Sequence, residues 1–214
     1  MLREIVSNEL YTVLLVIGLA IVAIAKLANP KRFNDFVYVL GNYKYLKIYS
    51  KDQKFLDKFD ALLFGNLIIT SSVFVYILFQ YFTETKEISV NLLFKIAIGI
   101  ASFFLIKVLI ERLIGSLFEI DKLIDEYIFQ KISYKNYIGI LLLPINAVLL
   151  YSFNLTLPII YLMFTILLIV NVIGLITSYK THQSLIKHHF FYFILYLCAL
   201  EITPYVILYK VFMT

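Results

Sequence analysis

The chain has 214 residues, of which 62% are hydrophobic, and its mean hydropathy is +0.89. Soluble domains are closer to half apolar, so this composition excludes an ordinary soluble domain and predicts an all-α, polytopic membrane protein with one domain over residues 1–214. Nineteen Lys and Arg residues against fourteen Asp and Glu residues give a net charge of +5. Because these bases gather in particular connections, they indicate membrane topology rather than nucleic-acid binding.

Six apolar runs predict a six-helix transmembrane bundle, with spans at about residues 10–28, 61–82, 90–110, 137–155, 157–178 and 190–212. The first run is long for the core of a signal peptide, and bases follow it, so we expect a retained helix. Thirteen bases lie in the first, third and fifth connections, and three lie on the other side. The positive-inside rule therefore predicts an inner-membrane protein whose two termini are both periplasmic.

The first connection has helical periodicity. Phe33, Phe36, Val37 and Leu40 recur at the spacing of one helix face, which predicts an interfacial amphipathic helix ending at 41–42. A second helix is expected after Ser50, from a capping-box pattern. Three roles stay open for this segment: a passive interfacial helix, a docking surface for a partner, or a surface that recognises lipid. The candidate partner or lipid surface comprises Lys31, Arg32, Phe33, Phe36, Lys44 and Lys47.

The third connection carries an apolar stripe that predicts a continuation of the third span beyond the membrane. The stripe comprises Leu113, Leu117, Ile120, Ile124 and Ile128. Asp121 and Asp125 are one helical turn apart, but paired carboxylates on a helix usually form a solvated face, so we expect no metal and no cofactor. His182, His188 and His189 lack a metal-binding motif and are interpreted as interfacial side chains.

The strongest functional signal is Glu201, which lies inside the last apolar run with Pro204 three residues later. A carboxylate at bilayer depth costs about 3 kcal/mol or more unless it is paired, protonated or hydrated. The proline leaves the carbonyl of Leu200 without its helical hydrogen bond. This segment therefore combines a buried acid with a weakened helix, which predicts a site or a packing junction.

Polar residues on other spans are predicted to lie at a similar depth. With Glu201 and Pro204, the candidate mid-membrane set comprises Asn146, Ser71, Ser72 and Lys107. Interhelical hydrogen bonding, a transport or proton site, and a catalytic site all remain open for this set. Lys107 has three predicted roles: to pair with Glu201, to pair with Glu111 one turn away, or to extend toward the interface.

Two stretches resemble a known family. One is Leu27-Ala28-Asn29-Pro30-Lys31-Arg32-Phe33, and the other runs from Leu195 to Pro204, through Cys198-Ala199-Leu200-Glu201-Ile202-Thr203-Pro204, and is followed by Leu208-Tyr209-Lys210. Together they resemble the bacterial inner-membrane family called domain of unknown function 4271, over essentially the whole chain. Thr203 stands where the family pattern tends to have leucine. The resemblance implies a small multi-span protein of bacteria with elaborate outer envelopes, and it implies no activity.

Motifs for metalloprotease, serine hydrolase, phosphate-loop or dinucleotide chemistry are missing from the sequence. We therefore expect a non-enzymatic inner-membrane subunit or scaffold of a cell-envelope or secretion complex. Its expected partners are the lipid bilayer and another membrane or cytoplasmic protein, with no nucleic acid. The alternatives are a small transporter or lipid-handling protein that uses the layer around Glu201, and a membrane partner of a polyprenyl-phosphate glycosyltransferase.

Overall fold

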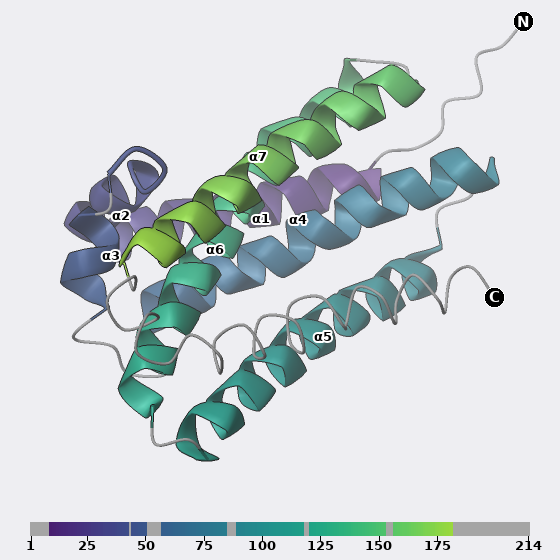
Figure 1. Ribbon diagram of the computed structural model, residues 1–214. Coiled ribbons are helices and arrows are strands. Elements are labelled where there is room, and N and C mark those ends of the chain that lie inside the picture. The colour runs from purple at the N-terminus through teal and green to yellow at the C-terminus, as the bar shows by residue number, and fades with distance from the viewer. Residues whose placement is uncertain are drawn as a thin grey trace, which may run out of the picture.

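The computed structural model describes residues 9–42, 44–50, 57–84, 89–117, 120–152 and 156–181. Within these ranges the protein is all-helical, as predicted (Figure 1). The helices are α1 (Glu9–Ala28), α2 (Pro30–Val37), α3 (Lys44–Tyr49), α4 (Lys58–Thr83), α5 (Val90–Leu117), α6 (Asp121–Tyr151) and α7 (Leu157–Thr181). Of these, α1, α4, α5, α6 and α7 contain segments long and apolar enough to cross a membrane. Five of the predicted spans are thus confirmed as helices of sufficient length and hydropathy, and the sixth, 190–212, lies outside the described residues.

Helix α4 is the centre of the bundle and packs against α1, α5 and α6, while α7 packs against α6. Helices α4 and α6 approach each other closely at Gly139. A Cβ atom at Gly139 would lie 2.8 Å from the Cα of Leu67, a distance that real side chains do not reach. Glycine is therefore required where the backbones of these two helices meet.

The third connection differs from its prediction. Helix α5 continues to Leu117, as expected from its apolar stripe, but α6 begins at Asp121, well before the predicted start of the fourth span at 137. The stripe is therefore divided between two helices, and Ile124 of α6 lies against Gly115 of α5. The hairpin buries Ile124 and Ile128 of α6, whereas Leu113 and Leu117 of α5 remain 61% and 71% exposed.

The short helices α2 and α3 lie at the end of the bundle where α1 ends and α4 begins, at the left of Figure 1. Pro30 occupies the first turn of α2, where a missing backbone N–H costs no hydrogen bond. Helix α2 ends at Val37, slightly before the predicted end. The sequence did not predict α3, which begins where the side-chain oxygen of Asn42 accepts a hydrogen bond from the backbone N–H of Lys44 (2.9 Å). The first part of the helix expected after Ser50 falls on residues 51–56, outside the described part of the chain, and its later apolar residues Phe59, Leu62 and Leu63 lie in α4.

Candidate functional site: a packed basic cap and a buried polar layer

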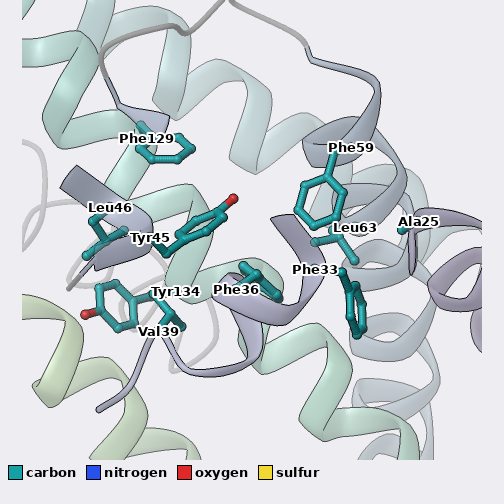
Figure 2. Close-up of a cluster of buried hydrophobic side chains, with 10 residues drawn as sticks. All are labelled: Ala25, Phe33, Phe36, Val39, Tyr45, Leu46, Phe59, Leu63, Phe129 and Tyr134. Atoms are coloured by element: carbon teal, nitrogen blue, oxygen red, sulfur yellow. The ribbon is translucent and has the colours of Figure 1, made fainter. Parts of the chain in front are cut away.

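An aromatic core joins α2 and α3 to the transmembrane helices, and we call residues 30–42 and 44–50 the cap (Figure 2). Phe36 is fully buried at its centre, with its ring centroid 5.4 Å from that of Tyr45 and 6.0 Å from that of Phe59. Phe129 of α6 stacks on Tyr45 at 5.7 Å. Burying a phenylalanine contributes about 1.5–3 kcal/mol, so these contacts hold the cap firmly on the bundle.

This packing corrects the expected surface role of Phe33 and Phe36. Both side chains are buried, and Phe33 packs against Phe59 of α4 with a centroid distance of 6.5 Å. The amphipathic pattern of α2 was identified correctly, but its apolar face lies against other helices instead of lipid headgroups. A helix face of this kind is buried equally well by protein or by lipid, so periodicity alone did not distinguish them.

Arg32 also faces inward, which removes it from the predicted surface. Its side chain is 11% exposed and forms ion pairs with Asp57 and Asp60 at the beginning of α4. The guanidinium also lies over the rings of Phe59 and Tyr49, at 4.7 and 5.1 Å from their centroids. Arg32 therefore links α2 and α3 to α4 through charge, hydrogen bonds and cation–π contacts.

The surroundings of Arg32 keep it charged and keep its neighbour neutral. Burial by itself lowers the pKa of Arg32, but the nearby Tyr45 and Asp60 outweigh burial and raise the pKa above its usual value. Burial raises the pKa of the Tyr45 hydroxyl, and the negative charge of Asp60 raises it further. The guanidinium and the phenol therefore hold these charge states throughout the physiological pH range.

The outer face of the cap is basic. Lys31, Lys44 and Lys47 are exposed, as predicted for a surface that meets a partner or lipid. Lys44 and Lys47 are one turn apart on α3, and Ile48 beside them is 44% exposed. Tyr38, after α2, is 70% exposed. The cap thus presents lysines beside an apolar side chain and an aromatic one, while its own core is complete.

The predicted mid-membrane residues only partly meet. The buried amide of Asn146 donates a hydrogen bond to the backbone carbonyl of Thr70 (2.9 Å), which connects α6 to α4. The hydroxyl of Thr70 donates to the carbonyl of Asn66 in its own helix (2.9 Å) and also lies 3.2 Å from the carbonyl of Gly139 in α6. Ser72 likewise donates to its own helix, at the carbonyl of Ile68 (2.6 Å), and Ser71 is half-buried. Glu201 and Pro204 lie outside the described residues.

Sequence reasoning missed several buried polar side chains of α4 and α6. They are Asn66, Gln130, Ser133 and Asn136. Gln130, Ser133 and Asn136 recur every three residues, a spacing that places them near one face of a helix. That periodicity was the available signal, but it falls in the stretch that was assigned to a connection rather than to a helix.

The layer predicts a modest effect of losing Asn146. Replacing Asn146 with leucine is expected to lower the free energy of unfolding by about 0.6 kcal/mol, and by about 1.7 kcal/mol at most, as for other hydrogen bonds between membrane helices. Detergent-dependent unfolding measures this change. The matched control is Ser102→Ala, because Ser102 is exposed on α5 and its loss is expected to leave stability unchanged. A larger loss than this range would mean that Asn146 does more than join α4 to α6.

A buried charged cluster lies between α5 and α6. Glu111 is completely buried and forms an ion pair with Lys131, and Lys107 is 7% exposed. Lys107 therefore lies among the helices instead of extending to the interface. Arg112 and Asp125 form a second ion pair at 2.9 Å, so Asp125 is engaged with a cation of its own chain. Among the described residues, no group of three or more His, Cys, Asp and Glu side chains is placed to hold a metal ion.

The fold and the cap together define a multi-pass helical membrane protein with a basic end. Within that class, the chain belongs to the family described as Domain of unknown function (DUF4271), whose family model matches residues 11–212. The resemblance noted in the sequence is thereby confirmed. No curated protein and no solved structure matches the chain.

Proposed function

We propose that the protein is a non-enzymatic subunit or scaffold of a bacterial cell-envelope or secretion complex, which docks a partner through the outer face of its cap. The observation that carries this proposal is the packed state of the cap. Phe33, Phe36, Tyr45 and Phe59 complete its core, so Lys31, Lys44 and Lys47 stand on a fixed support. Preorganised surfaces lose less entropy on binding than flexible ones, which favours a docking role over a passive interfacial helix.

The distribution of bases supports a location in the inner membrane with the cap in the cytoplasm. Described bases outside the spans gather at the end that holds α2, α3, the beginning of α6 and the end of α7. Short connections rich in lysine and arginine stay in the cytoplasm during insertion. The proposed partner is therefore a cytoplasmic protein, or the cytoplasmic part of a membrane protein, with an acidic surface.

Charge reversal of the cap tests this proposal. The amount of protein that copurifies with the triple variant Lys31→Glu/Lys44→Glu/Lys47→Glu is expected to fall at least about tenfold. The reason is that opposite charges on the two surfaces become like charges. The measurement is quantitative mass spectrometry of the tagged full chain, expressed at its native level and extracted gently. All three lysines are exposed, and the ion pair that Lys44 forms with Asp35 (3.7 Å) is of the surface kind that contributes about 1 kcal/mol or less. The abundance of the variant is therefore expected to match the wild type, with a small loss of thermal stability.

The control is Lys31→Arg/Lys44→Arg/Lys47→Arg, which keeps the charge and is expected to keep the partner. The proposal fails if the wild-type protein elutes without a stoichiometric protein partner. It also fails if the triple glutamate variant retains the partner in full.

A further inference from the structure

We infer that a groove between the end of α5 and the beginning of α6 binds a membrane lipid whose headgroup carries a primary amine. The groove has a volume of about 370 Å³, which is within the usual range of small-molecule sites. Asp121 and Asp125 of α6 line one side of it, and Leu109 and Leu113 are among the residues of α5 that line the other. This inference does not depend on the proposed docking function of the cap.

Two helix faces form the groove, one from each arm of the hairpin. The lining residues of α5 recur at the spacing of one helix face, and they are Leu109, Arg112, Leu113 and Ser116. Asp121 and Asp125 are one turn apart on α6, so they also share a face. Beside the groove the two helices are in contact, because Ile124 of α6 lies against Gly115 of α5. The lining side chains therefore project from regular, packed helices.

The charge of the groove favours a cation, because its lining includes two carboxylates and one guanidinium. Nε and Nη2 of Arg112 lie 3.0 and 2.9 Å from the same oxygen of Asp125, Oδ1. Within the described part of the chain, Oδ2 of Asp125 and the carboxylate of Asp121 have no donor or cation as a partner. Side chains one turn apart have Cβ atoms about 5–6 Å apart, and an ammonium group has three donors. One ammonium group can therefore bond both carboxylates.

The polarity of the groove changes along its length in the way that the polarity of a lipid does. Leu109 is eight residues before the end of α5, whereas Asp121 is the first residue of α6. At 1.5 Å per residue, Leu109 lies about 12 Å deeper in the bundle than the turn, where Asp121 lies. Leu109 and Leu113 are 56% and 61% exposed, so they offer hydrocarbon surface to an acyl chain. The carboxylates would then meet the headgroup of the same molecule.

The depth of the groove also fits a headgroup. The sequence places the basic-end boundary of the third span near residue 110, and the segment of α6 that is apolar enough to cross a membrane begins at Ile124. The groove extends from Leu109 to Asp121, so it includes both of these boundaries. Lipid headgroups occupy the layer just outside the hydrocarbon core. A soluble amine would reach the carboxylates but would have no use for the apolar end of the groove.

Lipid titration of the delipidated full chain tests the inference. Dioleoyl phosphatidylethanolamine and dioleoyl phosphatidylcholine are added separately in mixed micelles, and bound lipid is counted by native mass spectrometry. The two lipids share their net charge, phosphate and acyl chains, but methyl groups replace the N–H donors in phosphatidylcholine. The wild type is expected to bind phosphatidylethanolamine about fivefold more tightly, because it alone donates hydrogen bonds to the carboxylates and solvent partly screens them. Equal affinity for the two lipids would overturn the inference without any variant.

The test variant is Asp121→Asn, which keeps the size of the side chain and leaves the ion pair between Arg112 and Asp125 intact. It is expected to lose most of the preference for phosphatidylethanolamine, and it is expected to fold because Asp121 is exposed. The matched control is Glu84→Gln, which removes the same charge from an exposed residue just after α4 and is expected to keep the preference. Equal loss in both variants would overturn the inference, because the effect would then come from overall charge.

Two further arms complete the test. Asp121→Glu preserves the carboxylate and is expected to preserve the preference, so a loss equal to that of Asp121→Asn would contradict the inference. Phosphoethanolamine, the free headgroup, is added at the same amine concentration and is expected not to displace the lipid, because it makes no use of Leu109 and Leu113. If phosphoethanolamine displaces the lipid in full, the groove is a site for a soluble amine and the inference is wrong.

Discussion

Replacing Arg32 with methionine is expected to lower the free energy of unfolding by about 3–5 kcal/mol, the usual cost of removing one partner from a buried ion pair. The change leaves Asp60, which is largely buried, facing the cap core without the guanidinium that binds it at 2.8 Å. It also removes the cation–π contacts with Phe59 and Tyr49. Thermal unfolding of the detergent-solubilised protein measures the loss.

Two controls isolate the cause. Lys31→Met alters the adjacent, exposed residue and is expected to change stability by less than about 0.5 kcal/mol. The double variant Arg32→Met/Asp60→Leu removes both charges and is expected to regain most of the stability, because apolar pairs of similar volume replace buried ion pairs well. If Arg32→Met unfolds at the wild-type temperature, Arg32 does not hold the cap to α4.

Replacing Gly139 is the second change with a large expected effect. Gly139→Ala is expected to cost about 1–3 kcal/mol, and Gly139→Leu more, because added side-chain atoms would meet packed backbone. The obstructing atom is the Cα of Leu67, at 2.8 Å from the position of the new Cβ, and backbone cannot rotate away as a flexible side chain does. Separating α4 from α6 would also lengthen the hydrogen bond from Asn146 to Thr70.

The control for Gly139 is Gly99 on α5, where a Cβ would meet nothing within 4 Å. Gly99→Leu makes the same chemical change in a membrane-spanning helix and is expected to cause no loss of stability. Measured together by detergent-dependent unfolding, Gly139→Leu and Gly99→Leu separate close packing from the effect of leucine itself. Equal tolerance at both positions would contradict the close contact between α4 and α6.

The sequence predicted those parts of the fold that the length of an apolar run specifies, namely the membrane-spanning helices. For the five described spans, the runs of apolar residues predicted most of the helix ends to within a few residues. Unpaired backbone groups are costly in lipid, and a helix pairs them internally. The beginning of α6 was missed because Gln130, Ser133 and Asn136 make its first half polar. Those side chains are buried against protein, and a hydropathy pattern does not distinguish burial by protein from exposure to water.

The candidate site was predicted less well, for a related reason. Lys31, Arg32, Lys44 and Lys47 look alike in sequence, yet only Arg32 points into the core. Its partners Asp57 and Asp60 lie about 25 residues away along the chain. Pairings across such a distance depend on how α2 turns back over α4, which local periodicity does not encode. Lys31, Lys44 and Lys47 are exposed, as expected from the general rarity of buried lysine.

The aromatic core of the cap also has a consequence for the order of synthesis. Its members extend from Ala25 in α1 to Phe129 and Tyr134 in α6. Residues of α1 to α4 leave the ribosome first, whereas the stacking partner of Tyr45 is made some eighty residues later. Until α6 is inserted, Phe36 and Tyr45 lack one side of their packing. The growing chain therefore passes through a stage in which an aromatic surface is open beside the membrane, and the arrival of α6 closes it.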